Sequence, residues 1–185
     1  MSTADKSNDR QGGWLQTYTG KVFWPLDPRP EDVCIEDIAH ALSNLCRYGG
    51  HTNSFYSVAQ HCVLISRSVP THHSLWGLLH DASEAYLVDL PRPIKLCFPE
   101  YKIAEVKVMR AVCDHFGLCP EEPAMVKEMD ARILLNEQSS LMKAQAKDWA
   151  LGTEPIPYLS ITPWSPVEAK RKFLAQYNHL RRLDA

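Results

Sequence analysis

Apolar residues recur every three or four positions over most of this chain, the spacing that predicts amphipathic helices. The clearest stretch begins at Ile35 and favours a helix that ends near residues 47–51, where two adjacent glycines permit backbone angles that other residues avoid. Pro91 and Pro93 end the third helix, because proline cannot continue one. The pattern predicts further helices over residues 55–68, 74–88, 101–116 and 123–147, and a last one from residue 165 to near the C-terminus.

Local signals at the two ends of the chain complete this prediction. Ser165, Pro166 and Glu168 are typical of an N-cap, a first helical position and a capping-box partner. Near the N-terminus, the aromatic and proline-rich stretch over residues 14–33 contains YTGKVFWPL, which we expect to form a short extended hairpin, a flap that holds down the N-terminus. The sequence therefore predicts one compact all-α domain over residues 14–185, preceded by a polar, disordered tail over residues 1–13.

Composition narrows the function classes. The 185-residue chain has a net charge of −2, so it lacks the basic field that a nucleic-acid polymer would require. Its six cysteines form no C-x-x-C pair and stand mostly at apolar positions, which favours reduced, buried thiols over an extracellular disulfide framework. The polar N-terminus lacks the apolar core of a signal peptide, and no apolar run approaches a membrane span. We expect a cytoplasmic protein without a membrane partner.

Candidate chemistry begins with WGLLHDASE, residues 76–84, where an apolar run contains His80, Asp81 and Glu84. Residues four apart share one face of a helix, so His80 and Glu84 are predicted to point the same way, with Asp81 beside them. A carboxylate among apolar neighbours is costly unless it is paired or bound to a cation. A metal ion would offset that cost.

Two further residues stand on apolar helical faces. His61 follows Val58 in the second predicted helix, and Asp130 lies in the fifth. Each alone has a simpler explanation: a core histidine bonded to a carbonyl, and an aspartate that pairs with Arg132 or caps a helix. Together, two histidines and two aspartates from three helices predict a mixed nitrogen and oxygen site for a divalent metal.

Two stretches of sequence around these candidate ligands resemble a known family of enzymes. LLHDASEAYLVDLPRPIK resembles the metal-dependent 5′-deoxynucleotidases of the HD-domain phosphohydrolase family, and CRYGGHTNSFYSVAQHCV resembles small phage and prophage variants. The resemblance extends from about Thr19 to the last helix and implies an all-α HD-domain fold. The implied metal ligands are His61, His80, Asp81 and Asp130.

The resemblance also implies substrate and catalytic roles. Glu84 aligns with a glutamate that positions or deprotonates the attacking water, and Asp89 with an aspartate near the scissile phosphate and sugar. Arg47 and Lys95 match basic residues that hold phosphate oxygens, although simple solvation is the alternative for both. Two weaker candidates for substrate contact come from position alone: Lys127, one turn before the aspartate ligand, and His51, which could equally cap a helix.

The aromatic and thiol neighbours of these residues receive no catalytic assignment. Cys62 stands beside His61, but adjacent helical residues point about 100° apart, which argues against a thiol nucleophile. Tyr48 and Tyr56 could stack on a base, although each is more typical of a core.

The implied activity is hydrolysis of a deoxynucleoside monophosphate to deoxynucleoside and phosphate, with one divalent ion of cobalt, manganese, zinc or iron. One alternative is a deoxynucleoside triphosphohydrolase of the dATP type, which releases tripolyphosphate. An alternative of another class is a metal-bound nucleotide sensor without turnover. Relatives of this type are commonly dimers, so we expect a homodimer or a higher homo-oligomer.

Overall fold

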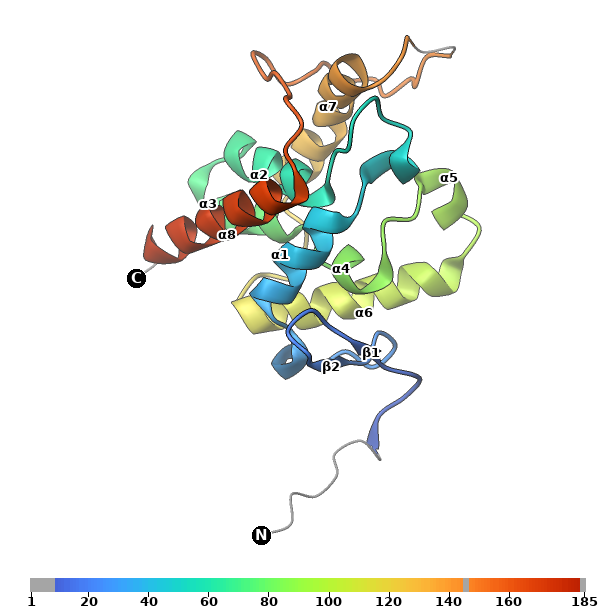
Figure 1. Cartoon of the computed structure of the whole chain (residues 1–185), viewed down its shortest axis with the longest axis vertical. Helices are drawn as coiled ribbons and strands as arrows, with labels where there is room; N and C mark the ends of the chain where they lie inside the picture. Colours follow the sequence, from blue (N-terminus) through green and yellow to red (C-terminus); the bar gives the residue numbers. More distant parts are fainter. Residues whose placement is uncertain (1–8, 145–146, 184–185) are drawn as a thin grey trace.

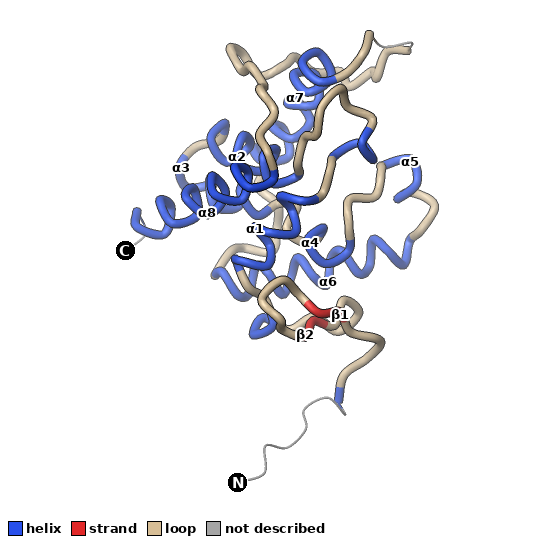
Figure 2. The backbone as a smooth tube through the Cα atoms, in the orientation of Figure 1, coloured by secondary structure: helices blue, strands red, loops and turns tan. Residues whose placement is uncertain are grey.

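The computed structural model describes residues 9–144 and 147–183, and over this range the fold is all-α apart from one short antiparallel strand pair (Figures 1 and 2). None of the helices in this range combines the length and the apolar character needed to cross a bilayer. The strands are β1 (Leu15–Gln16) and β2 (Val22–Phe23), and the α-helices are α1 (Ile35–Asn44), α2 (Val58–Ser68), α3 (Thr71–Leu79), α4 (Glu84–Leu87), α5 (Arg92–Lys95), α6 (Pro99–Phe116), α7 (Ala124–Leu141) and α8 (Pro166–Leu183).

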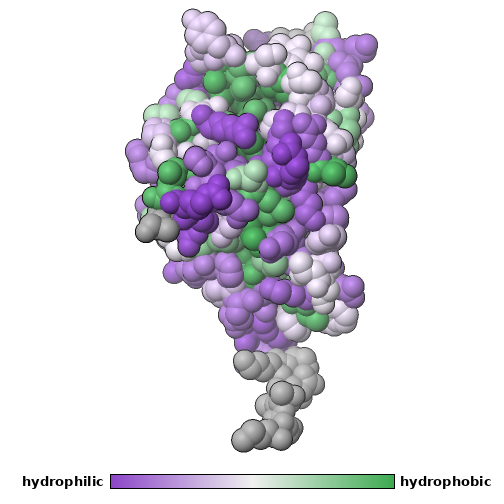
Figure 3. Space-filling model, turned by 60° about the vertical axis from the view of Figure 1, so that its left-hand side comes forward, coloured by the Kyte–Doolittle hydropathy of each residue, from purple (hydrophilic) through white to green (hydrophobic). Residues whose placement is uncertain are grey.

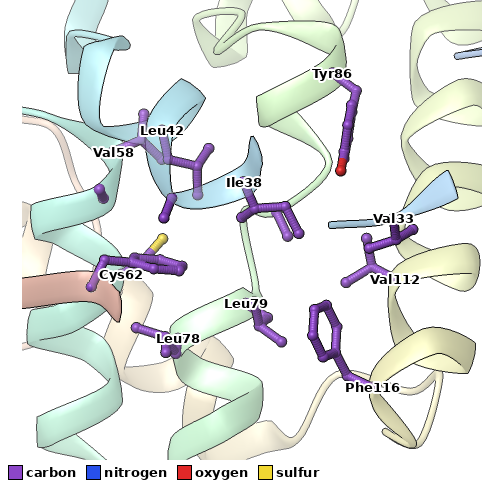
Figure 4. Close-up of a cluster of buried hydrophobic side chains, with 14 of the residues drawn as sticks. Val33, Ile38, Leu42, Val58, Cys62, Leu78, Leu79, Tyr86, Val112 and Phe116 are labelled. Atoms are coloured by element: carbon purple, nitrogen blue, oxygen red, sulfur yellow. The ribbon is translucent and has the colours of Figure 1, made fainter. Parts of the chain in front are cut away.

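Helix α2 lies at the centre of the domain and contacts α1, α3, α7 and α8 (Figure 1). The C-terminal helix α8 returns across α1, α2 and α3, which closes one side of the core. Apolar side chains from these helices and from α6 pack in one cluster that includes Ile38, Leu42, Leu78 and Phe116 (Figure 4). Burying each such side chain stabilises the fold by about 1.5–3 kcal/mol. On the face shown in Figure 3, hydrophobic residues form separate patches between hydrophilic ones.

The N-terminal flap forms as a hairpin, with strands that begin earlier than expected. Leu15 pairs with Phe23 across β1 and β2. The ring of Phe23 is fully buried and stacks on Tyr86 of α4, with ring centroids 3.7 Å apart. Thr19 in the turn donates from its amide and its hydroxyl to the buried carboxylate of Asp37 on α1. The flap is therefore held to the domain by the stacking of Phe23 on Tyr86 and by the two hydrogen bonds from Thr19 to Asp37.

The predicted disordered tail covers two kinds of residue. Residues 1–8 lie outside the described residues. Within residues 9–13, Arg10 forms an ion pair of 2.6 Å with Asp32 and places its guanidinium over the ring of Trp24. The part of the chain that contacts the domain thus begins before residue 14.

Several helix boundaries match the sequence pattern. Helix α6 ends at Phe116 because Gly117 adopts the left-handed conformation, with φ 72°. Helix α8 begins at Pro166, and the hydroxyl of Ser165 accepts a hydrogen bond from the amide of Glu168 at 3.2 Å. The carboxylate of Glu168 forms an ion pair with Lys172, four residues later in the helix, at 2.9 Å. The contact observed for this carboxylate is therefore an ion pair and not the predicted capping-box hydrogen bond.

The prediction of one continuous helix over residues 74–88 was wrong. Helix α3 ends at Leu79 and α4 begins at Glu84. Between them the amide of Ala82 bonds to the carbonyl of Leu79, three residues back, and the amide of Glu84 likewise bonds to Asp81. Three-residue hydrogen bonds tighten the chain into turns, so the backbone around the two metal-ligand candidates leaves the regular helix.

The fifth predicted helix was too long, and one short helix was missed. Helix α7 ends at Leu141 and not at residue 147, because the backbone turns extended at Met142, with φ −121° and ψ 165°. The carbonyl of Leu141 then accepts a hydrogen bond of 2.7 Å from the amide of Asn53 in a distant loop. Helix α5 follows Pro91, with a proline in its first turn, where the missing amide costs nothing. Both features depend on signals that apolar periodicity does not carry.

The cysteines are all free thiols, but fewer are buried than expected. Cys62 and Cys113 are buried, Cys34 and Cys46 are half-buried, and Cys97 and Cys119 are exposed. The apolar helical spacing therefore predicted burial correctly for Cys62 and Cys113 and not for the other four cysteines.

Candidate metal centre

His61 enters the site from the first turn of α2. The hydroxyl of Ser57 caps this helix by accepting from the amide of Gln60 at 3.1 Å. The neighbouring apolar residues Val58 and Ile65 face the core, and the imidazole of His61 is fully buried with them. Its Nδ1 lies 2.7 Å from the carboxylate of Glu137 on α7. This contact directs Nε2 toward the end of α3.

His80 enters from the end of α3, where the helix gives way to turns. Its Nδ1 lies 2.8 Å from the carbonyl oxygen of Gly77. Its Nε2 lies 3.1 Å from Nε2 of His61. A carbonyl and an ionised carboxylate are acceptors only, so each Nδ1 carries a hydrogen. When both rings are neutral, the two Nε2 lone pairs face each other, an arrangement that a cation between them stabilises.

Two carboxylates complete the group. Asp130 Oδ1 on α7 lies 3.1 Å from His61 Nε2 and 3.9 Å from His80 Nε2. Asp81 Oδ2 lies 3.3 Å from His80 Nε2 and 3.7 Å from His61 Nε2. A divalent ion binds such atoms at about 2.0–2.2 Å, which leaves neighbouring ligand atoms about 3 Å apart. The donor atoms of the His61, His80 and Asp130 group therefore fit a metal ion, and Asp81 lies within reach of the same point.

The simpler explanation for Asp130 does not hold. Arg132 pairs with Glu128 at 3.3 Å and donates from Nε to the carbonyl of Glu154 at 3.0 Å. Asp130 instead faces the two histidines, its side chain 41% exposed. That exposure leaves one side of the group open to small molecules.

The charges within this group shift one another's pKa values. Burial lowers the pKa of His80, but the carboxylate of Asp81 outweighs it, so the pKa of His80 lies well above its ordinary value. For Asp81, burial raises the pKa, and the positive charge of His80 reverses this and brings it well below its ordinary range. The pair thus holds a proton tightly in the absence of a metal ion, and a cation would replace that proton.

Glu137 is a buried residue of the candidate site that the sequence interpretation missed. Its carboxylate is fully buried and contacts His61 and the hydroxyls of Tyr48 and Tyr56, the latter at 2.8 Å. Burial raises its pKa, but the charges of Arg47 and His61 overcome this and lower it to about 2. The residue stands seven positions after Asp130, on the same apolar face of α7. The costly-carboxylate argument that selected Asp130 would therefore have selected Glu137 too.

Arg47 lies beside the group, as predicted. It opens a tight turn, η3 (Arg47–Gly50), in which Tyr48 adopts φ 59°. Its Nη1 lies 3.3 Å from Asp81 Oδ2, and its Nε lies 3.5 Å from Glu137 Oε2. The guanidinium is nearly buried, and its Nε has no hydrogen-bond partner. This buried Nε faces Glu137 and not solvent, so the Nη atoms are the donors that could reach an oxyanion ligand.

Glu84 and Lys95 lie on the other side of the group. Glu84 is buried, and its Oε2 has no hydrogen-bond partner. Lys95 on α5 lies 3.8 Å from Glu84 Oε1, and it pairs with Glu105 of α6 at 2.6 Å. Burial, together with the carboxylates of Asp81 and Asp89, raises the pKa of Glu84 well above its ordinary value.

Asp89 follows Glu84 after one sharp turn. The turn passes through Val88 at φ 67°, and the hydroxyl of Tyr101 donates to the carbonyl of Val88 at 2.5 Å. Burial raises the pKa of Asp89, and the charge of Arg47 opposes the shift. Asp89 therefore lies within electrostatic range of the group, in an environment that favours its protonated form.

Two predicted substrate residues are not drawn into the group. Lys127 and His51 are both exposed, and no hydrogen bond or ion pair among the described residues links either side chain to the histidines or aspartates. Glu122, which the sequence interpretation did not single out, lies in the loop before α7. Partial burial raises its pKa, and the charge of His80 opposes this shift, so Glu122 lies within electrostatic range of the group.

Cys62 forms a second donor group with His80 and Asp81, whose ligand atoms lie within 4.8 Å of one another. Its thiol is part of the apolar cluster in Figure 4, and burial raises its pKa to about 11. A protonated thiol is a poor nucleophile. This agrees with the sequence-based argument against such a role.

The fold and the site define an all-α protein with histidine and aspartate residues grouped so that they could hold a metal ion. No protein-family model matches the chain. It is 36% identical over 172 residues to the uncharacterized protein YfdR of Escherichia coli (strain K12), over 92% of this chain and 97% of that protein. It is 32% identical over 190 residues to the uncharacterized protein RCAP_rcc00048 of Rhodobacter capsulatus, over 91% of this chain and 96% of that one. The chain belongs to the family that contains these two proteins.

Proposed function

We propose that this protein is a metal-dependent phosphohydrolase of the HD-domain type that removes phosphate from deoxyribonucleoside monophosphates. The observation that carries the proposal is the convergence of His61 from α2, His80 and Asp81 from the end of α3, and Asp130 from α7. The two histidine Nε2 atoms lie 3.1 Å apart, and the aspartate oxygens lie 3.1–3.9 Å from them. Arg47 lies directly beside them. The names of the two relatives assign no activity, so the proposal rests on the site and on the sequence resemblance.

The four proposed ligands are two imidazoles and two carboxylates, a set that suits cobalt, manganese, zinc or iron. When bound, such an ion would polarise a phosphoryl oxygen and lower the pKa of a water molecule. Two contacts prepare the ligands for this task. Glu137 and the carbonyl of Gly77 each hold one histidine Nδ1, which fixes both tautomers and leaves both Nε2 atoms free to ligate.

Arg47 is the proposed phosphate-binding residue. Asp81 and Glu137 hold its planar guanidinium from two sides, so little conformational freedom is lost when phosphate binds. Its burial strengthens the attraction to a phosphate oxygen. Lys95 contributes a second positive charge near Glu84, although its ion pair with Glu105 draws it toward α6.

Glu84 is the proposed general base, and Asp89 the proposed proton donor. In the proposed hydrolysis, the oxygen of water forms a bond to phosphorus as the bond between phosphorus and the 5′ oxygen breaks. Glu84 accepts a proton from the water, and Asp89 gives one to the 5′ oxygen of the leaving deoxynucleoside. The raised pKa of Asp89 supports its role as the proton donor. The raised pKa of Glu84 makes its ionised carboxylate a stronger proton acceptor.

The distribution of charge favours a monophosphate over a triphosphate. Arg47 is buried at the group, whereas Lys95 is already paired with Glu105 and Lys127 is exposed. Glu84, 3.8 Å from Lys95, offsets its positive charge further, which leaves little positive charge on that side for a longer polyphosphate. A single phosphoryl group matches the available positive charge better.

The test is product analysis with metal-stripped protein that has been reloaded with cobalt or manganese, given dAMP and dATP in parallel. We expect orthophosphate and deoxyadenosine from dAMP, with dATP left intact. Tripolyphosphate from dATP would overturn the monophosphate assignment in favour of a triphosphohydrolase. Absence of turnover with either nucleotide, with bound metal measured in the same sample, would refute the hydrolase and favour a nucleotide sensor.

A further inference from the structure

We propose that Glu137 is a positioning residue that couples metal binding to the conformation of the loop over residues 46–57, which carries Arg47. The proposal rests on the proposed function, because it takes His61 as a metal ligand and Arg47 as the phosphate-binding residue. It adds a connection between them that neither role requires. One buried carboxylate would hold both the metal ligand and the phosphate-binding loop.

Both oxygens of Glu137 are used, and each is linked to the loop. Oε1 accepts from Nδ1 of His61 at 2.7 Å and from the hydroxyl of Tyr56 at 2.8 Å. Oε2 accepts from the hydroxyl of Tyr48 and lies 3.5 Å from Nε of Arg47. The ligand ring and both ends of the loop therefore meet at one side chain.

The loop needs such support, because its backbone is strained at one end. Tyr48 adopts the left-handed backbone conformation, with φ 59° and ψ 26°, which residues other than glycine rarely adopt. The amide of Arg47 bonds to the carbonyl of Tyr56 at 2.9 Å, and the amide of Asn53 bonds to Leu141 at the end of α7 at 2.7 Å. In Figure 1 the loop rises from α1 beside α7, the helix that contributes both Glu137 and Leu141.

The physical link is the shared oxygen Oε1. A cation at Nε2 of His61 would make the Nδ1 hydrogen a stronger donor and fix Glu137 more firmly. Glu137 would then hold Tyr48, Tyr56 and Arg47 in the observed arrangement. By thermodynamic reciprocity, an ordered loop raises metal affinity by the same factor that the metal orders the loop.

Two measurements on the full chain test the coupling, and neither needs a nucleotide. The first is the cobalt dissociation constant from competition with a chelator. The second is amide hydrogen exchange of peptides that cover residues 46–57, with and without cobalt. In the unmodified protein we expect cobalt to slow exchange in this loop several-fold.

The variants separate coupling from simple folding. Glu137→Gln should raise the cobalt dissociation constant by about 10- to 100-fold and abolish the effect of cobalt on loop exchange. Tyr48→Phe leaves the contact between His61 and Glu137 in place and removes one of the two loop hydroxyls that bind Glu137, the one from Tyr48. We expect a reduced protection of the loop by cobalt and a 3- to 10-fold weaker cobalt affinity, on the order of typical coupling factors. Glu128→Gln, an exposed position on the same helix, is the matched control and should match the unmodified protein.

The outcomes distinguish this proposal from the proposed function. If Tyr48→Phe keeps both the unmodified cobalt affinity and the cobalt-dependent protection of the loop, the coupling is refuted while the hydrolase stands. If dAMP is not hydrolysed but these cobalt effects appear, the coupling stands without the hydrolase. If the unmodified protein binds no cobalt, the coupling is overturned together with the metal centre.

Discussion

The two sides of the proposed metal centre differ in how fully their buried polar groups are satisfied. On the side of α2 and α7, His61, Glu137 and Tyr56 form a closed set in which the imidazole, the carboxylate and the phenol all find partners. On the side of α4 and α5, Glu84 is also buried, yet its Oε2 has no hydrogen-bond partner. Lys95 lies 3.8 Å from its other oxygen, too far for a direct hydrogen bond.

This difference separates positioning from chemistry. A fully satisfied buried network is rigid and holds its members in one geometry. An unpaired buried carboxylate is costly, and it retains the capacity to bind a ligand or accept a proton. We therefore expect changes on the α2–α7 side to alter binding and changes on the α4–α5 side to alter turnover.

The largest expected effect is on the unsatisfied side. Glu84→Gln keeps the shape of the side chain but removes its ability to accept a proton. We expect kcat for dAMP to fall by about 100- to 10,000-fold, the usual contribution of a general base. The measurement is steady-state kinetics on cobalt-loaded protein, with the cobalt dissociation constant taken in parallel.

The matched control for this change is Glu100→Gln, at an exposed position near the start of α6. It should leave both quantities unchanged. Full turnover by Glu84→Gln would refute its role as a base. A large loss of cobalt affinity in the same variant would instead assign Glu84 to the metal centre and remove the difference between the two sides.

A smaller effect is expected from the ligand group. Asp130→Asn removes the charge that lies 3.1 Å from His61 Nε2. Loss of contacts around a metal ligand costs 10- to 100-fold in affinity, so removing a ligand charge should weaken cobalt binding by at least about 100-fold. Asp114→Asn on α6, where the aspartate pairs only loosely with Arg110 at 4.0 Å, is the control. Unchanged cobalt affinity in Asp130→Asn would show that the aspartate is not a ligand.

The sequence predicted the all-α class and most helices, because apolar spacing reports which face of a helix is buried. The same reasoning singled out His61 and Asp130, since a polar residue on an apolar stripe is conspicuous. It also singled out His80, but it predicted a continuous helix there, whereas the chain passes into turns held by three-residue hydrogen bonds. The contact between the His80 ring and the carbonyl of Gly77 is likewise not visible in the periodicity.

Glu137 shows a different limit. Its position on the apolar stripe of α7 was visible in the sequence, but its partners come from a loop about 80 residues earlier, as with Tyr56 at 81 residues' separation. Tyr56 is a core residue, as expected, and is fully buried. The sequence did not show that the hydroxyls of Tyr48 and Tyr56 both donate to this carboxylate. Only tertiary structure brings such a set together.

The smallest expected effect concerns pH and tests the proton that the His80–Asp81 pair holds. The pKa of His80 is raised above its ordinary value of about 6.5, because Asp81 outweighs the opposing effect of burial. In metal-free protein this raised pKa stabilises the fold below about pH 6.5, and the stabilisation is lost as the pH rises through the raised value. A metal ion needs the neutral ring and must displace that proton.

Cobalt affinity should therefore increase about tenfold per pH unit upward from pH 6.5 and level off once the pH exceeds the raised pKa of His80. Titration calorimetry in two buffers of different ionisation enthalpy would measure the proton released per cobalt bound. Affinity that stays constant from pH 6.5 upward, with no proton released, would mean that the ring is already neutral. His80, at the end of α3, would then be as ready to bind metal as His61 is through its contact with Glu137. A proton on the His80 ring would then have no part in stabilising the metal-free site.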